Sequence, residues 1–127
     1  MSLRKAAHMV RLKIKRIYDE PEDEDGLRVL VDRLWPRGLS KERASLDYWM
    51  KDISPSNELR KWYQHESGKW VEFKLRYFSE LDMQGEQVAL LRELIARHDV
   101  TLLYSSRASD INNATALAEY LESSIPS

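Results

Sequence analysis

The sequence predicts an α/β fold: a single three-layer domain in which a small, mainly parallel β-sheet is flanked by helices. Two apolar runs, Val29–Val31 and Val100–Tyr104, are typical of fully buried strands because neither contains a charged residue. Apolar residues at helical spacing precede and follow the second run. A helix, a buried strand and another helix in succession favour a parallel sheet, whose strands need long crossover connections.

The length and composition are those of one globular domain. A chain of 127 residues buries about two-thirds of its unfolded surface, which is enough for a core. Hydrophobic residues make up 43% of the chain and charged residues 32%, a composition that is not typical of disorder. We expect residues 1–9 to form a flexible tail and residues 10–123 to form the single α/β domain.

The first half of the predicted domain contains strands and short elements. Residues 10–15 alternate apolar and basic side chains, as a half-exposed strand does. The acidic segment Glu20–Gly26 predicts a solvated turn. Ser40 is a suitable N-cap for a short helix, and Ser56 for the next one. Between them, Leu46–Ile53 is either a short strand or an irregular segment.

The second half is mainly helical. Aromatic and aliphatic residues recur at helical spacing over residues 69–81, which predicts a helix there. Gly85 begins the next predicted helix, and the pair at residues 98–99 ends it. After the buried strand, Ser109 or Asp110 is expected to cap the last helix.

Composition excludes several kinds of site. The chain has no cysteine, so it has no disulfide, thiolate nucleophile, iron–sulfur cluster or cysteine-bound zinc. The three histidines lack the spacing of paired metal ligands, and the four glycines form no dinucleotide-binding or P-loop motif. We therefore expect neither a metal nor a cofactor. No apolar run approaches the ~20 residues of a membrane span, and a cytoplasmic location is expected.

One candidate site is the turn from Asp32 to Gly38, at the end of the first buried strand. Ligands of open α/β sheets bind at the carboxyl ends of strands. Arg33 and Arg37 could hold a planar or tetrahedral anion by paired hydrogen bonds. The structural alternative is that Asp32 pairs with one of these arginines and that Trp35 packs over the sheet end. Both interpretations remain open from the sequence.

A second candidate is the loop that follows the second buried strand. Its polar residues, together with the N-terminus of the next helix, could bind phosphate, sulfate or carboxylate. The alternative is a polar connection whose side chains only cap and turn the chain. Whether this loop meets the Asp32–Gly38 turn is open. The candidate anion-binding residues of the loop are Ser105, Ser106, Arg107, Asn112 and Asn113.

The basic side chains of the first strand allow a different function. In one interpretation they form only the solvent face of that strand, and in the other they bind nucleic acid together with exposed aromatics. Trp35 and Trp49 lie outside the regular apolar stripes and could line a pocket. The acidic turn beside the first strand would weaken a nucleic-acid patch, and the formal net charge of −1 gives no global attraction to nucleic acid. These basic residues are Arg11, Lys13, Lys15 and Arg16.

Four segments of the chain carry a family resemblance: RVLVDRLWPRGLSKE, KDISPSNELRKWYQH, KWVEFKLRYFSEL and TLLYSSR. They are similar to the YeaO-like branch of the domain of unknown function 488 family, and the resemblance runs from about Val10 to Leu121. It implies an α/β fold and no settled biochemical role. The residues that match the branch are Asp32, Arg33, Pro36, Arg37, Gly38, Tyr104, Ser105 and Asn113.

The resemblance also implies a loss of thiol chemistry. The broader family is similar at both loops but has a cysteine where Tyr104 stands, and a Cys-His-Arg sequence where residues 112–114 stand. The leading hypothesis is thus a small domain that binds an anionic, phosphorylated or nucleotide-like ligand. Catalysis stays open, with Asp32 or Tyr104 as the proton-transfer group. The alternative is a nucleic-acid-associated or protein-interaction module without catalysis, and the oligomeric state is open.

Overall fold

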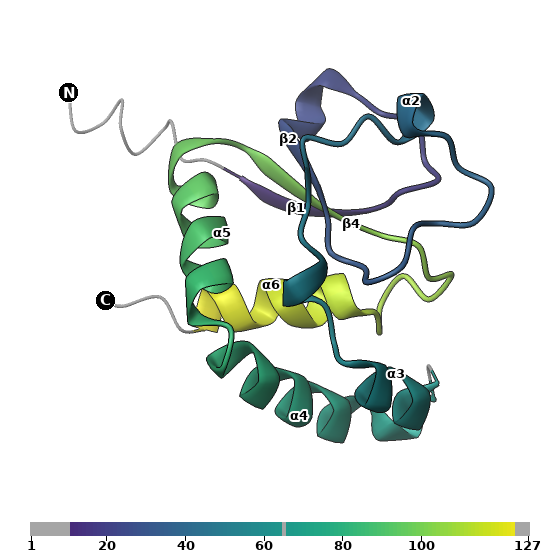
Figure 1. Cartoon of the computed structure of the whole chain (residues 1–127), viewed down its shortest axis with the longest axis vertical. Helices are drawn as coiled ribbons and strands as arrows, with labels where there is room; N and C mark the ends of the chain where they lie inside the picture. Colours follow the sequence, from purple (N-terminus) through teal and green to yellow (C-terminus); the bar gives the residue numbers. More distant parts are fainter. Residues whose placement is uncertain (1–10, 65, 124–127) are drawn as a thin grey trace.

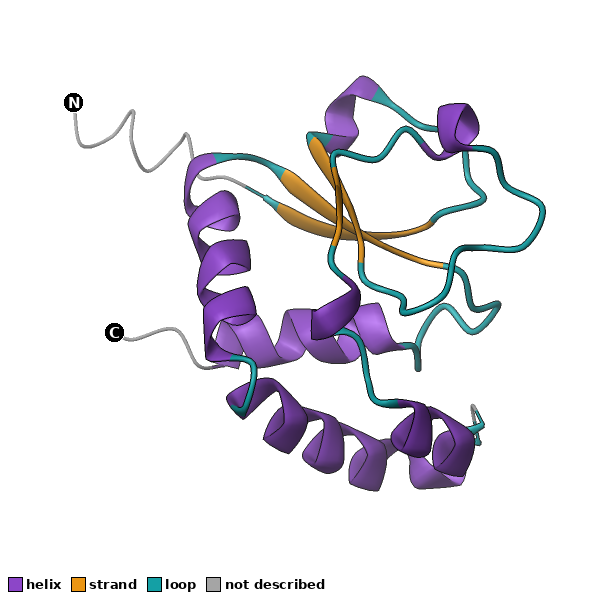
Figure 2. Ribbon diagram, viewed as in Figure 1, coloured by secondary structure: helices purple, strands orange, loops and turns teal. Residues whose placement is uncertain are grey.

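The computed structural model describes residues 11–64 and 66–123, so the predicted tail and Val10 lie outside the described residues. The sheet has four strands in the order β1-β4-β2-β3, and every neighbouring pair is parallel. The parallel sheet with flanking helices confirms the predicted α/β class (Figures 1 and 2). The strands are β1 (Leu12–Arg16), β2 (Leu27–Leu30), β3 (Tyr48–Trp49) and β4 (Val100–Tyr104).

Most of the helical structure lies between β3 and β4 and after β4. Each long helix follows the predicted apolar periodicity, since Phe73, Tyr77 and Leu81 of one and Val88, Leu91 and Leu94 of the next are buried. Short 3-10 turns η1 (Asp23–Asp25), η2 (Lys51–Ile53) and η3 (Ser67–Lys69) occur in the connections. The α-helices are α2 (Lys41–Ala44), α3 (Asn57–Tyr63), α4 (Trp70–Asp82), α5 (Gly85–Arg97) and α6 (Asn113–Ser123).

The two faces of the sheet are covered differently. The larger core joins alternate residues of β2 and β4, such as Val29 and Leu102, to the long helices. Figure 1 shows α4, α5 and α6 on that side of the sheet. On the opposite face Leu30 and Leu103 pack under the segment of residues 31–47, in which α2 is a single turn. One face therefore carries helices, and the other carries mainly the loop that contains the Asp32–Gly38 turn.

Two of the predicted N-caps are confirmed and one is wrong. The Ser40 and Ser56 hydroxyls accept hydrogen bonds from backbone N–H groups of α2 and α3, each at 3.1 Å. The last helix begins after Asn112, whose side-chain oxygen accepts from the Thr115 N–H at 2.9 Å. Ser109 and Asp110 therefore do not cap α6. Four residues between 109 and 113 are suitable caps by type, and the sequence pattern does not distinguish among them.

The acidic turn is not wholly solvated. Asp25 has a relative exposure of 1% and forms a buried ion pair with Arg28, which is 4% exposed. Lys15 donates to the same carboxylate at 3.1 Å. The Thr101 hydroxyl of β4 donates to the backbone oxygen of Asp25 at 2.7 Å, which ties the turn to the sheet. The prediction of a solvated turn is wrong for Asp25, because its ionic partners, Lys15 and Arg28, lie outside the acidic segment.

Gly26, next in the chain, is required by the close approach of Asp99. Its φ is +64°, and a Cβ at this position would lie 2.2 Å from the Asp99 carbonyl oxygen. We expect Gly26→Ala to lower the free energy of unfolding by about 3 kcal/mol, from backbone strain plus displacement of Asp99. Urea denaturation checks this value.

Gly38→Ala is the matched control for that substitution. Gly38 also has a positive φ, +76°, but a Cβ there would meet nothing within 4 Å. It should therefore lose only the strain term, about 1 kcal/mol. Equal losses in the two variants would contradict a steric role for Asp99.

Candidate functional site

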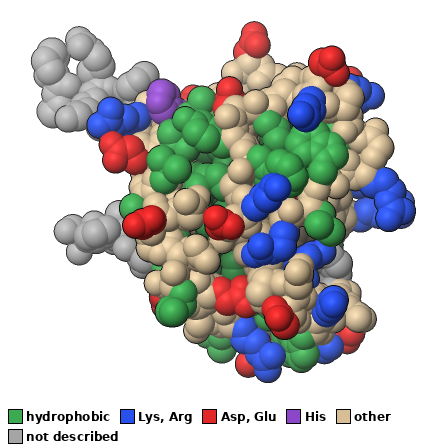
Figure 3. Space-filling view, viewed as in Figure 1, with side chains coloured by type: hydrophobic (Ala, Val, Ile, Leu, Met, Phe, Trp, Pro, Cys, Tyr) green, Lys and Arg blue, Asp and Glu red, His purple; other side chains and the backbone are tan. Residues whose placement is uncertain are grey.

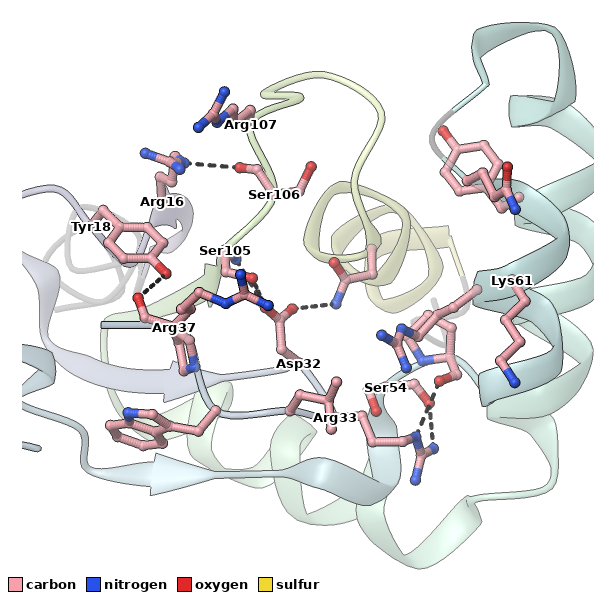
Figure 4. A pocket seen from close by; sticks show the side chains of 18 of the residues that line it. Arg16, Tyr18, Asp32, Arg33, Arg37, Ser54, Lys61, Ser105, Ser106 and Arg107 are labelled. Atoms are coloured by element: carbon pink, nitrogen blue, oxygen red, sulfur yellow. Dashed lines mark hydrogen bonds between the residues drawn. The ribbon is translucent and has the colours of Figure 1, made fainter. Parts of the chain in front are cut away.

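A cavity of about 1020 Å³ opens at the carboxyl ends of the strands. Its walls come from the residues that follow β1, β2 and β4 on one side, and from α3 and the Ser54-Pro55 segment on the other. Figure 3 shows Lys and Arg side chains gathered across the middle of the visible face, and Figure 4 shows the cavity from close by. Parallel α/β sheets bind ligands at this edge.

The two candidate loops meet at Asp32. One carboxylate oxygen of Asp32 accepts from the Ser105 N–H at 2.9 Å and from the Ser105 hydroxyl at 2.7 Å. The other oxygen accepts from the Asn113 side-chain amide at 3.1 Å (Figure 4). Asn113 also donates to the Val31 carbonyl at 2.8 Å. Asp32 thus joins the end of β2 to the end of β4 and to the start of α6.

Arg33 and Arg37 do not pair with Asp32. Arg33 donates from Nε to the Pro55 carbonyl at 3.3 Å and from Nη2 to the Ser54 carbonyl at 3.2 Å. Arg37 is exposed, and its carbonyl accepts from the Tyr18 hydroxyl at 2.7 Å. The structural alternative, in which Asp32 is neutralised by an adjacent arginine, is therefore wrong among the described residues. Both arginines line the cavity.

The described lining residues carry a strong excess of positive charge. Arg107 lines the cavity, as predicted from the sequence, and is exposed. Asp32 is the one acidic side chain among the described lining residues, and three hydrogen bonds already reach it. The cationic lining residues are Arg16, Arg33, Arg37, Arg60, Lys61 and Arg107.

Three of these cations were not predicted to belong to the anion site, although Arg16 was among the candidate nucleic-acid contacts. Arg16 ends β1, where its Nε donates to the Ser106 carbonyl at 3.0 Å and its guanidinium stacks on the Tyr18 ring, 4.6 Å from the centroid. Arg60 and Lys61 lie on the exposed side of α3. The available signal for Arg16 was its place at the end of a predicted strand, because parallel strands end at the same edge of the sheet, whereas no comparable signal marks Arg60 and Lys61.

Some predicted site residues lie elsewhere. Tyr104 is 4% exposed and does not line the cavity. Burial raises the pKa of the Tyr104 hydroxyl, Asp19 adds to the increase and Arg16 opposes it. Asn112 is fully buried, and its amide donates to the Ala108 carbonyl at 2.8 Å while its oxygen caps α6. Neither Tyr104 nor Asn112 is therefore placed to contact a ligand in the cavity.

The remaining candidates divide between lining and packing. Ser106 lines the cavity, but its hydroxyl accepts from the Ala108 N–H at 3.0 Å and so turns the loop. Trp35 lines the cavity and donates to the Leu39 carbonyl at 2.6 Å. Trp49 does not line it: the indole donates to the Asp32 carbonyl at 2.8 Å and packs edge-on against Trp35.

Two further observations concern metals and membranes. Among residues 11–64 and 66–123, no three His, Asp or Glu side chains gather as a metal ion would need. In the same part of the chain, the helices are too short or too polar to cross a bilayer.

Known proteins resemble this chain over nearly its whole length. The model of the inactive DUF488-N3 subclade matches residues 11–126. The uncharacterized protein YeaO of Escherichia coli (strain K12) is 40% identical over 114 residues, which cover 90% of this chain and 99% of that protein. The uncharacterized proteins Mb3100c of Mycobacterium bovis and Rv3073c of Mycobacterium tuberculosis (strain H37Rv) are 40% identical over 111 residues, 87% of this chain and 93% of theirs. No solved structure matches the chain.

Proposed function

The chain belongs to the inactive DUF488-N3 subclade, and from this premise we propose that it binds a small phosphorylated or nucleotide-like anion without transforming it. The description of the subclade as inactive supports binding rather than catalysis. The sequence has no cysteine and so no thiolate nucleophile. Of the two predicted proton-transfer groups, Tyr104 lies outside the cavity and Asp32 is occupied by three hydrogen-bond donors.

The observation that carries this proposal is the charge of the cavity. Among the described residues that line it, six side chains are cationic and one is a carboxylate, although the whole chain has a formal net charge of −1. Guanidinium and ammonium groups form short, charge-assisted hydrogen bonds with phosphate and carboxylate oxygens. The cavity volume is about 1020 Å³, which suits an organic anion better than an inorganic ion.

A thermal-shift screen tests the proposal with inorganic phosphate, sulfate, nucleotides and sugar phosphates. We expect at least one phosphorylated compound to raise the melting temperature, because a ligand at 100 times its Kd stabilises a fold by about 2.7 kcal/mol. Arg37→Ala should lower the affinity for that ligand about tenfold or more, since a charge-assisted hydrogen bond contributes roughly 1.5–3 kcal/mol. Arg43→Ala is the matched control, because Arg43 is exposed on α2 and does not line the cavity.

The proposal would be contradicted if no anion raised the melting temperature. It would also be contradicted if Arg37→Ala and Arg43→Ala bound the anion with equal affinity. Binding of oligonucleotides with a steep dependence on salt would instead favour the nucleic-acid module. The first strand gives that alternative little support. Lys15 is paired with Glu22 and Asp25, and Arg16 is bonded to the Ser106 carbonyl.

A further inference from the structure

Five of the six cations among the described lining residues fall into two groups at opposite ends of the cavity, and the sixth, Arg37, belongs to the same turn as Asp32. The strand-side group is Arg16, at the end of β1, with Arg107, in the loop after β4. The helix-side group is Arg33, bonded to the Ser54 carbonyl, with Arg60 and Lys61 of α3. Figure 4 shows Arg16 and Arg107 far from Arg33 and Lys61, on either side of Asp32.

The sheet order explains this separation. Strands β1 and β3 occupy the two outer positions, and β4 and β2 lie between them. Neighbouring strands are about 4.8 Å apart, so three spacings place the outer strand ends about 14 Å from each other. Arg16 ends β1, and α3 follows shortly after β3. One phosphate bound close to either group leaves the other group without an anion.

Asp32 divides the positive charge of the cavity. Its carboxylate lies between the two groups because it follows β2, a central strand. Ser105 and Asn113 supply three hydrogen bonds to it, whereas a carboxylate has about four acceptor positions. A phosphate placed at the middle would be repelled by this charge. A hydroxyl there could donate to the remaining position.

We propose, on the basis of the function proposed above, that the ligand is a hydroxylated molecule with an anionic group at each end, of the sugar bisphosphate class. One phosphate binds the strand-side group and the other binds the helix-side group. A hydroxyl of the middle part donates to Asp32. The volume of about 1020 Å³ has room for such a molecule.

Titration calorimetry with fructose 1,6-bisphosphate, fructose 1-phosphate and fructose 6-phosphate tests the two-ended binding. The bisphosphate is expected to bind about tenfold or more tightly than either monophosphate, because it gains one further set of charge-assisted hydrogen bonds. In Arg107→Ala and in Lys61→Ala this affinity ratio should fall toward one. Arg43→Ala, outside the cavity, should keep the ratio of the parent protein.

Hexane-1,6-diol bisphosphate, which has no free hydroxyl, tests the role of Asp32. It is expected to bind more weakly than fructose 1,6-bisphosphate by about tenfold or more, the contribution of one hydrogen bond to a charged group. Equal affinities of the two bisphosphates would remove the hydroxyl contact from the proposal.

The results distinguish two-ended binding from anion binding in general. Equal affinities for bisphosphate and monophosphates, or an unchanged bisphosphate affinity in Lys61→Ala, would overturn two-ended binding and leave an anion site. Absence of binding by all the phosphates would overturn both. Arg107 and Lys61 are exposed, so both variants should fold, which circular dichroism and an unchanged melting temperature can verify.

Discussion

Asp25→Asn is expected to lower the free energy of unfolding by about 3 kcal/mol, because it leaves the buried guanidinium of Arg28 without its counter-ion. Arg28 also donates to the carbonyls of Ala44 and Ser45, at 2.9 Å and 3.1 Å, so the guanidinium is held in place after the substitution. The charge therefore stays buried and uncompensated. Urea denaturation at neutral pH measures the loss.

Asp23→Asn is the control for this substitution. Asp23 belongs to the same acidic turn but is exposed, and surface substitutions usually change stability by less than about 0.5 kcal/mol. Similar losses in the two variants would mean that the turn acts through its total charge. A lower free energy of unfolding in Asp25→Asn alone would mean that the buried pair of Asp25 and Arg28 stabilises the fold.

The same carboxyl group gives a pH dependence. Burial alone would raise the pKa of Asp25, but hydrogen bonds from the Glu22 N–H, Lys15 and Arg28 outweigh it and hold that pKa below its usual range. Its stabilising contribution is therefore complete above the unfolded pKa of about 3.9 and is lost as the pH falls through the folded value. The stability difference between the parent and Asp25→Asn should shrink below about pH 4. A difference that stays constant into acid would contradict this assignment.

The regular elements could be predicted because their signal is local. The strand at Val100–Tyr104 has the predicted bounds, and α4 and α5 begin and end within one residue of the expected positions. Each of these segments is defined by a run or a period of apolar residues. The burial of Asp25 has no such signal, since Arg28 and Thr101 bury it from other parts of the chain.

The candidate site could be predicted only in part. The sequence located Arg33, Arg37, Ser105 and Arg107 because each follows a buried strand. It missed Arg60 and Lys61, which approach the strands only once α3 has packed beside α4. The order of elements in the sequence is enough to assign short loops after buried parallel strands to the site. It does not assign a helix that follows a strand of two residues.

Asp32→Asn is expected to lower the free energy of unfolding by about 2–3 kcal/mol, because it places an amide NH₂ group opposite the hydrogen-bond donors that join the two loops. The carboxylate accepts from the Ser105 N–H, the Ser105 hydroxyl and the Asn113 amide. An asparagine in this place has one acceptor oxygen, and its NH₂ group would face one of those donors. A donor left without an acceptor costs about 1–3 kcal/mol, and hydrogen bonds to charged groups are the stronger ones.

Anion binding should respond in the opposite direction, and this separates an Asp32 that holds the two loops together from one that contacts the anion. Removing the negative charge from the cavity should leave the affinity for inorganic phosphate unchanged or raise it, as calorimetry at a temperature where the variant is folded can measure. Asp19→Asn, an exposed carboxylate that does not line the cavity, is the control. Unchanged stability with loss of phosphate binding would instead make Asp32 a direct ligand contact. Lower stability with retained binding would mean that its charge joins β2, β4 and α6 and so shapes the cavity that the cations surround.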